Sequence, residues 1–270
     1  MEWGILAGAA GLLCGFLWAQ NNWLTEKKYV LHHPRIASPM RIVHLSDLHA
    51  KQFGRGNRRL LRRVRRQKPD LIAFTGDLVD RFRLETDAAY DLMRDLTALA
   101  PVVYCPGNHE YGRRDREQIL VKLQACGVIV LRQQIREMQM AQNRLAILGI
   151  DEIGYGGKSA EQLAKLEQSS KFRLLLAHFP HYFDSSYSRY AIDLTLCGHA
   201  HGGQFWFPGG GVYAPGQGLF PKYCKGMHQK GKARMIVSRG LGNSGFPLRL
   251  FNFPQIVVVE LLPEQIGQQK

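Results

Sequence analysis

Short apolar runs alternate with amphipathic stretches along most of the chain. The runs RIVHLSD (41–47) and LIAFTGD (71–77) end in polar residues, and the segment between them predicts a helix that Asn57 caps and Pro69 ends. Further helices are predicted over roughly 85–99 and 115–126, and further strands at 101–108, 128–131, 144–151, 172–178, 193–199, 234–240 and 255–261. The alternation indicates an α/β domain with strands packed under helices, and a long surface loop at 202–232.

The first 25 residues have a different pattern. Between Glu2 and Glu26 the chain carries no charge. A helix rises about 1.5 Å per residue, so this run is long enough to cross a hydrocarbon layer of about 30 Å. We therefore expect an N-terminal transmembrane or membrane-anchor helix, with tryptophans near its ends. A cleaved signal peptide is the competing interpretation, but no Lys or Arg precedes the run and no convincing cleavage site follows it.

Basic residues follow this run and none precedes it. Lys27, Lys28, Arg35 and Arg41 come soon after it, which predicts that the rest of the chain lies in the cytoplasm. We divide the chain into an N-terminal membrane anchor (1–25), a linker (26–40), one catalytic domain (41–262) and a polar tail (263–270).

Composition narrows the possible partners. With 36 Lys and Arg against 22 Asp and Glu, the formal charge is +14, which favours anionic lipid, nucleic acid or a phosphorylated small molecule as partner. The five cysteines are odd in number and include no CxxC pair. A disulfide framework or a zinc ribbon is therefore not expected, and we interpret the cysteines as reduced thiols.

Polar side chains follow five of the predicted strands at their ends. The segments SDLH, TGDLVD, PGNHE, LAHFPH and CGHAHGG each come directly after an apolar run. Ligands of α/β sheets bind outside the carboxyl ends of the strands, so these side chains should meet at one rim. In an extended strand end, residues i and i+2 point the same way. Asp47 with His49, and His199 with His201, can therefore point together as a pincer on a metal, although either pair taken alone is more often a capped turn or a solvated loop.

The order of these blocks resembles that of the calcineurin-like metallophosphoesterases over most of residues 41–260. The series is Asp47-x-His49, Gly76-Asp77-x-x-Asp80, Gly107-Asn108-His109-Glu110, His178 and Gly198-His199-x-His201. The stretch SRGLGNSGFPLRLFNFPQIVVVEL resembles the membrane-associated bacterial branch, which includes UDP-diacylglucosamine pyrophosphatases. Pro254 is followed by Gln255 where that branch commonly has Glu. The resemblance implies a four-layer α/β/β/α sandwich with a dinuclear metal site.

The resemblance also implies which residues hold the metals. One ion would be held by Asp47, His49, Asp77 and His201, and the other by Asp77, Asn108, His178 and His199, with Asp77 as the bridge. Carboxylate, amide and imidazole ligands without thiolate suit Mn²⁺, Fe or Zn²⁺. Two such cations neutralise phosphate oxygens and lower the pKa of a bridging water for attack on phosphorus.

Three further residues match catalytic positions of the family. His109 is similar to the histidine that protonates or stabilises the leaving oxygen. By the same resemblance, Asp80 would orient His109 and Arg81 would grip phosphate, although Phe82 stands where the family has glycine. The alternative for Asp80 and Arg81 is a surface turn with a charged pair. Arg239 and Arg249 are candidates for substrate contact, with loop packing as the alternative.

One predicted helix is strongly basic. Residues 55–68 contain eight Lys and Arg and no acid, while Leu60, Leu61 and Val64 give a narrow apolar face. We expect the apolar face to pack on the sheet and the arginines to lie against anionic headgroups, each adding up to about 1 kcal/mol. The other interpretation is that the arginines form a solvent-exposed face and contact no membrane.

The resemblance therefore implies a phosphoester hydrolase that uses two metal ions. We expect it to cleave a phosphodiester or pyrophosphate bond, with a lipid-linked or nucleotide-linked substrate at the membrane rather than nucleic acid. The alternatives are a phosphoprotein phosphatase or nuclease with the same site, and a basic adaptor without activity. Specificity resides in loops that the motifs do not fix.

Overall fold

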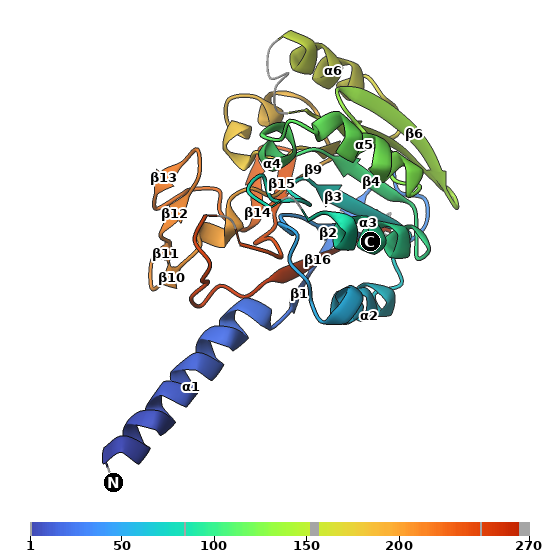
Figure 1. Ribbon diagram of the computed structural model, residues 1–270. Helices are drawn as coiled ribbons and strands as arrows, with labels where there is room; N and C mark the ends of the chain where they lie inside the picture. The colour runs from blue at the N-terminus through green and yellow to red at the C-terminus, as the bar shows by residue number, and fades with distance from the viewer. Residues whose placement is uncertain (1, 84, 152–156, 244, 265–270) are drawn as a thin grey trace.

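Two six-stranded sheets organise the computed structural model, which describes residues 2–83, 85–151, 157–243 and 245–264 (Figure 1). The first sheet has the order β1–β16–β2–β3–β4–β5, and only β16 and β2 are antiparallel neighbours. Its strands are β1 (Thr25–His33), β2 (Met40–Leu45), β3 (Leu71–Thr75), β4 (Val102–Cys105), β5 (Ile129–Val130) and β16 (Gln255–Pro263). Every residue of β3 and β4 is buried, as expected for parallel strands covered on both faces.

The second sheet has the order β14–β15–β9–β8–β7–β6. Its inner strands are parallel, and an antiparallel strand closes each edge. The strands are β6 (Gln134–Met140), β7 (Asn143–Gly149), β8 (Phe172–Leu176), β9 (Leu194–Cys197), β14 (Gly226–Lys230) and β15 (Ala233–Val237).

Three apolar clusters hold four layers together. Residues of both sheets, such as Ile42, Val103 and Leu174, share the cluster between the sheets. A second cluster joins the first sheet to α2 (Arg58–Arg66), α3 (Asp87–Thr97) and α5 (Arg116–Ala125). A third joins the second sheet to α6 (Gly157–Glu167) and two short 3₁₀ turns, 180–182 and 187–189. The expected α/β/β/α sandwich is confirmed.

Helix α1 (Glu2–Asn22) projects away from this sandwich (Figure 1). It is long and apolar enough to cross a membrane, a criterion that a signal sequence near the N-terminus also meets. Only its C-terminal end touches the domain. The Phe16 ring packs against Phe251, the Gln20 side chain accepts the Phe251 N–H, and Arg59 donates to the Asn22 carbonyl.

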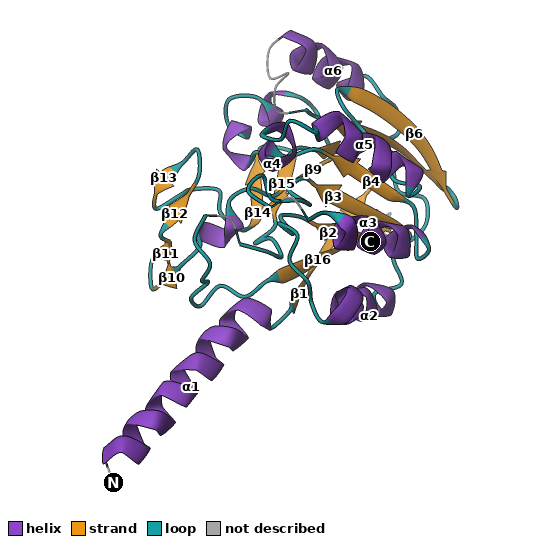
Figure 2. Cartoon of the chain, viewed as in Figure 1, coloured by secondary structure: helices purple, strands orange, loops and turns teal. Residues whose placement is uncertain are grey.

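Several elements differ from the sequence prediction. The linker expected over 26–40 is wrong for most of its length, because β1 pairs with the whole of β16. The long loop expected over 202–232 contains the short strands β10 (Trp206–Phe207), β11 (Gly210–Gly211), β12 (Tyr213–Ala214) and β13 (Gly218–Leu219), as well as β14 (Figure 2). Strand β6 and helix α6 were not predicted. Of the expected polar tail, 265–270 lies outside the described residues, and Pro263 ends β16.

Candidate metal centre

Loops from both sheets meet above the carboxyl ends of their strands. Five strands each deliver candidate ligands: β2 leads to Asp47 and His49, β3 to Asp77, β4 to Asn108, β8 to His178, and β9 to His199 and His201. The structure therefore brings together all seven residues that the sequence singled out as metal ligands. Their convergence follows from the parallel order of the strands, which places these ends on one side.

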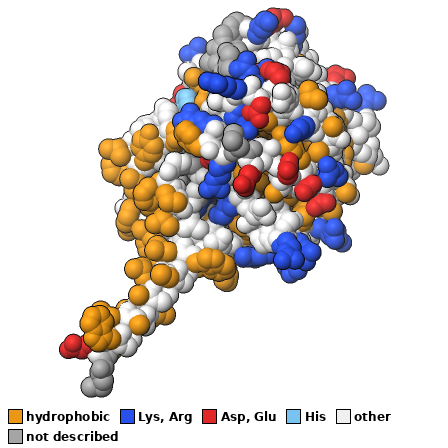
Figure 3. All heavy atoms as spheres, viewed as in Figure 1, with side chains coloured by type: hydrophobic (Ala, Val, Ile, Leu, Met, Phe, Trp, Pro, Cys, Tyr) orange, Lys and Arg blue, Asp and Glu red, His pale blue; other side chains and the backbone are white. Residues whose placement is uncertain are grey.

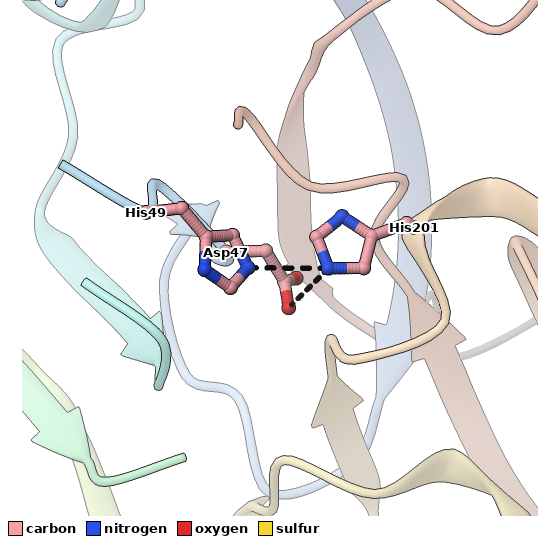
Figure 4. A group of neighbouring side chains, drawn as sticks. All are labelled: Asp47, His49 and His201. Carbon is pink, nitrogen blue, oxygen red and sulfur yellow. Dashed lines mark hydrogen bonds and ion pairs between the residues drawn. The ribbon is translucent and has the colours of Figure 1, made fainter. Parts of the chain in front are cut away.

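One group consists of Asp47, His49 and His201, all buried (Figure 4). One candidate ligand atom from each lies within 4.8 Å of the others. His49 Nε2 is 3.2 Å from His201 Nε2, and His201 Nε2 is 3.8 Å from Asp47 Oδ1. Two ring nitrogens and a carboxylate oxygen thus face one point.

A second group consists of Asp77, His178 and His199, also buried. His178 Nε2 lies 3.2 Å from Asp77 Oδ2 and 3.2 Å from His199 Nδ1. The other ring nitrogen, His178 Nδ1, is 2.7 Å from the Thr75 carbonyl, to which only a protonated nitrogen can donate. This contact leaves the Nε2 lone pair of neutral His178 facing the group, the orientation that metal-binding histidines require.

The two groups adjoin at their carboxylates. Asp77 Oδ2 is 3.7 Å from His49 Nε2, and Asp47 Oδ1 is 3.9 Å from His178 Nε2. Two buried oxygens, Asp47 Oδ2 and Asn108 Oδ1, have no hydrogen-bond partner within the described residues. Buried polar atoms are normally paired, so these oxygens fit a role as ligands of a divalent cation.

The backbone at this centre is not that of extended strand ends. Asp47, His49, Asp77, His199 and His201 all have φ between 45° and 65°. The left-handed region is costly for residues other than glycine and is concentrated at functional sites. The expected pincers, in which residues i and i+2 of an extended strand end point the same way, are therefore wrong in their geometry, because a turn after the strand orients each ligand.

Two glycines permit the close approach of these turns. A Cβ on Gly198 would lie 1.9 Å from Ser46 Oγ and 2.5 Å from Asp47 Oδ2. A Cβ on Gly107 would lie 2.3 Å from Asp77 Oδ1. Neither position has room for a side chain, so the glycines of these motifs bring the ligand loops into contact.

Burial and mutual contact shift the pKa values of the ligands. Burial lowers the pKa of His199 and His201 well below the ordinary value, which keeps both rings neutral and able to coordinate. Burial also raises the pKa of Asp47. For Asp77, burial acts in the same direction, but attraction to His178 and His49 in their protonated forms outweighs it and lowers the pKa. Divalent cations would relieve the repulsion between the two buried carboxylates.

The three predicted catalytic residues border the same centre. His109 Nδ1 accepts the Arg81 backbone N–H at 3.1 Å, so the proton of the neutral ring is on Nε2. Asp80 Oδ2 is 3.6 Å from His49 Nδ1, while Asp80 Oδ1 is 3.9 Å from His109 Nδ1. Asp80 is thus closer to a candidate ligand than to the histidine it was expected to orient. Arg81 lies over the Phe82 ring, 4.7 Å from its centroid.

Two supporting residues lie directly behind the ligands. Glu110 is buried, and its carboxylate accepts the backbone N–H groups of Asp77, Val79 and Gly107 at 2.8–3.1 Å. Sequence reasoning assigned it no role, although it follows His109 in the same motif. Arg249 is also fully buried, with its Nη2 3.4 Å from His201 Nδ1 and its Nη1 2.8 Å from the Arg239 carbonyl. It therefore packs behind His201 and is not the substrate contact considered from the sequence.

A cavity of about 300 Å³ opens over the centre. It is lined by candidate ligands, by Arg81 and His109, and by the loop residues Gln204, Tyr213, Pro215, Gly245 and Phe246. Substrate entering this cavity meets both groups of ligands and His109 at once.

Comparisons with known proteins agree with this geometry. The family described as calcineurin-like phosphoesterase matches residues 40–203. The chain is 30% identical over 229 residues to the uncharacterized metallophosphoesterase YkuE of Bacillus subtilis, covering 82% of this chain and 78% of the relative. It is also 30% identical over 232 residues to the phosphodiesterase YaeI of Escherichia coli, covering 84% and 83%.

A solved structure shares the fold at low sequence identity. GAP50, described as the anchor in the inner membrane complex of Plasmodium, superposes with a TM-score of 0.50 at 12% identity, covering 83% of this chain and 81% of that one. At this identity the likeness concerns the fold alone.

Proposed function

This chain belongs to the calcineurin-like phosphoesterase family, and from that premise we propose that it is a phosphodiesterase or pyrophosphatase that uses two metal ions at a membrane. The observation that carries the proposal is the pair of buried ligand groups that meet at Asp77 beneath one open cavity. The phosphodiesterase YaeI is a relative over most of the chain and supports the diester preference.

The chain's residues fit two divalent cations. Asp47, His49 and His201 would hold one, His178, Asn108 and His199 the other, and Asp77 would serve both. When bound, such cations supply positive charge to phosphate oxygens and lower the pKa of water. The thiolate-free donor set suits Mn²⁺, Fe or Zn²⁺.

His109 and Arg81 would act on the substrate itself. Because Arg81 N–H donates to His109 Nδ1, the ring carries its proton on Nε2, and that N–H can be offered to the leaving oxygen. The Arg81 guanidinium at the cavity wall would hold a non-bridging phosphate oxygen. Asp80, whose Oδ2 faces His49 Nδ1, would position the His49 ring, while the unprotonated Nδ1 of His109 is held by the Arg81 N–H and not by Asp80.

Helix α1 supports the membrane context. Its apolar side chains face solvent, with Trp3 85% and Leu12 79% exposed. Leaving such a helix in water is unfavourable, whereas a bilayer would cover all of it. Five arginines of α2 are exposed, and Arg59 among them contacts the end of α1, so this face would lie at the anionic headgroups: Arg58, Arg59, Arg62, Arg65 and Arg66.

Exposed apolar loops continue the surface of α1. Phe251 packs on Phe16 of the helix, and the neighbouring Leu250 pairs with Phe205 and Trp206 at the base of β10. Beyond this point the hairpin loops expose Phe207, Tyr213, Leu219 and Phe220. Figure 3 shows hydrophobic side chains extending from α1 onto the body of the molecule. A contiguous apolar surface of this kind is typical of membrane or protein contact.

This arrangement favours a substrate that reaches the enzyme from the bilayer. Tyr213 and Phe246 line the cavity over the metal centre and also belong to the exposed apolar loops. A lipid-linked or nucleotide-linked phosphoester could therefore place its polar part at the metals while an apolar part stays near the membrane.

The test is a substrate screen with the full-length protein in detergent, supplemented with Mn²⁺. We expect turnover of bis(4-nitrophenyl) phosphate and of lipid-linked diphosphates, and much slower turnover of phosphopeptide and DNA. Asn108→Ala and His109→Ala should lose at least about 10² in kcat/KM, with an unchanged circular dichroism spectrum. Fast phosphopeptide or DNA hydrolysis with inert diesters would establish the phosphatase or nuclease alternative, and full activity of both variants would refute the site.

A further inference from the structure

A second cavity, of about 440 Å³, lies next to the metal centre. Gly245 and Phe246 line both cavities, so this segment forms the wall between them. His49 and Asp80 also line the second cavity. A ligand held at the metals could therefore extend past Phe246 into this space.

Two basic side chains, Lys51 and Arg83, border the second cavity without a carboxylate partner among the described residues, and burial lowers the pKa of Lys51 to about 7. The Lys51 ammonium donates to the backbone carbonyls of Asn21 and Leu241, and Arg83 exposes its side chain at the rim. Within the described parts of the chain, neither forms an ion pair, in contrast to Arg63 or Arg113. Asp80 is the one acid among the lining residues, and its Oδ1 accepts the Phe82 N–H.

Neutral polar and apolar groups complete the walls. Asn21, at the end of α1, and Asn243 are joined by a hydrogen bond of 2.7 Å between their side-chain amides. Phe82, Phe246 and Pro247 form the apolar part of the wall. The cavity thus combines cations, amides and aromatic rings within reach of the metal centre and of the end of the membrane helix.

We propose that this cavity is a subsite for a second anionic group, a phosphate, of the same substrate whose scissile phosphate lies at the metals. The proposal rests on the proposed function. It adds the class of substrate, which is phosphoesters that carry two separate anionic groups. Lys51 and Arg83 would be its cationic ligands, because ammonium and guanidinium groups donate charge-assisted hydrogen bonds to phosphate oxygens.

Lys51 also has a structural contact that the test must separate. Its bond to the Asn21 carbonyl places a cation at the C-terminal end of α1, which stabilises a helix. Arg59 makes the equivalent contact with the Asn22 carbonyl at 3.0 Å, but it does not line the cavity. Arg59→Gln is therefore a matched control for Lys51→Met.

The experiment compares two reporter diesters, propyl 4-nitrophenyl phosphate and its 3-phosphonopropyl counterpart, with the Mn²⁺-loaded full-length protein in detergent free of anionic lipid. The measured quantity is the ratio of kcat/KM for the phosphonate diester to that for the propyl diester. We expect the wild-type ratio to be about ten or more, a difference of about 1.4 kcal/mol. Lys51→Met and Arg83→Gln should each lower the ratio at least about threefold, mainly through KM, and Arg59→Gln should leave it unchanged.

The outcomes separate the two proposals. If neither diester is hydrolysed, the proposed function fails. If the propyl diester is hydrolysed but the wild-type ratio is near one, or Arg83→Gln leaves the ratio unchanged, the subsite is overturned. A ratio that falls equally in Lys51→Met and Arg59→Gln assigns Lys51 to capping α1 and also overturns it. Weaker binding of Lys51→Met and Arg83→Gln to phosphatidylglycerol vesicles, with an unchanged kcat/KM ratio, also overturns the subsite. The cavity would then hold a membrane headgroup.

Discussion

Asp77 contacts both groups of candidate ligands, so its substitution should affect both metals. We expect Asp77→Asn, loaded with Mn²⁺ and desalted, to retain less than about half of the wild-type metal, since an amide lacks the charge that a shared ligand supplies. Metal content is measured by inductively coupled plasma mass spectrometry. Asp91→Asn is the control, because Asp91 is exposed and pairs only with Arg94 among the described contacts. Wild-type metal content in Asp77→Asn would contradict the bridging role.

His44 lies beneath this centre and gives a prediction about acid stability. The side chain is fully buried, its Nε2 is 2.8 Å from Thr75 Oγ1, and burial lowers its pKa to about 3. Between pH 6.5 and 3 the unfolded chain binds a proton at this residue and the folded chain does not, so acidification destabilises the fold. At pH 5 the loss from His44 is about 2 kcal/mol.

His44→Gln retains a hydrogen-bonding group and removes the titration. We expect the free energy of unfolding, measured with denaturant in detergent, to fall less between pH 7.5 and pH 5 in the variant than in the wild type, by about 2 kcal/mol. His32→Gln, at an exposed histidine of β1, is the control and should follow the wild type. Identical pH profiles for wild type and His44→Gln would show that His44 is not held neutral.

The identities of the candidate ligands could be predicted from the sequence, but their geometry could not. Asp47, Asp77 and His199 each follow an apolar run, which is visible in the sequence. Their left-handed backbone depends on long-range contacts such as the bond from His199 N–H to Asp47 Oδ1 at 2.9 Å. The buried role of Arg249 likewise depends on tertiary folding, which brings the Arg239 and Gly242 carbonyls and the Asn243 side chain into hydrogen-bonding contact with its guanidinium. Local patterns contain neither piece of information.

At the scale of elements, the inner strands and the edge strand β5 were predictable, whereas the edge strands β1, β6 and β14 were not. Strands such as β3 and β8 are buried apolar runs, so hydrophobicity alone identifies them. The edge strands β1 and β6 mix exposed residues, several of them charged, with partly buried ones, and they pair with β16 and β7. Edge strands often carry charge, which hides them from a search for apolar runs.

The buried and exposed faces of helix α2 give a prediction about stability. Leu60 is fully buried in the cluster beneath the helix, while Arg62 is exposed. We expect Leu60→Ala to lower the free energy of unfolding by about 2–4 kcal/mol, because it removes buried methyl groups and leaves a cavity. Arg62→Ala should change it by less than about 0.5 kcal/mol. Chemical denaturation followed by circular dichroism measures both, and equal effects would contradict the assigned faces.

At the scale of the whole molecule, the end of α1, the metal centre and the apolar hairpins are connected. Asn21 of α1 lines the cavity that also contains His49, and Phe246 separates that cavity from the one over the metals. The hairpins β10–β13 lie on the same side of the body as α1, whereas β6 lies at the far side (Figure 1). If α1 spans the bilayer, we expect the opening of the metal site to face the membrane surface.

This orientation can be measured with a fluorophore that reports water exposure. In a Cys14→Ala, Cys126→Ala background, Leu219→Cys and Arg136→Cys are labelled with an NBD group and reconstituted in phosphatidylglycerol vesicles. Leu219 is 69% exposed on the hairpin surface, and Arg136 is exposed on β6. We expect a blue-shifted emission, quenched by doxyl-labelled lipid, for the label at position 219 only, because apolar hairpins enter the headgroup region while β6 stays in water. Equal emission and quenching at the two positions would place the hairpins away from the bilayer, and the metal site would then open to bulk solvent.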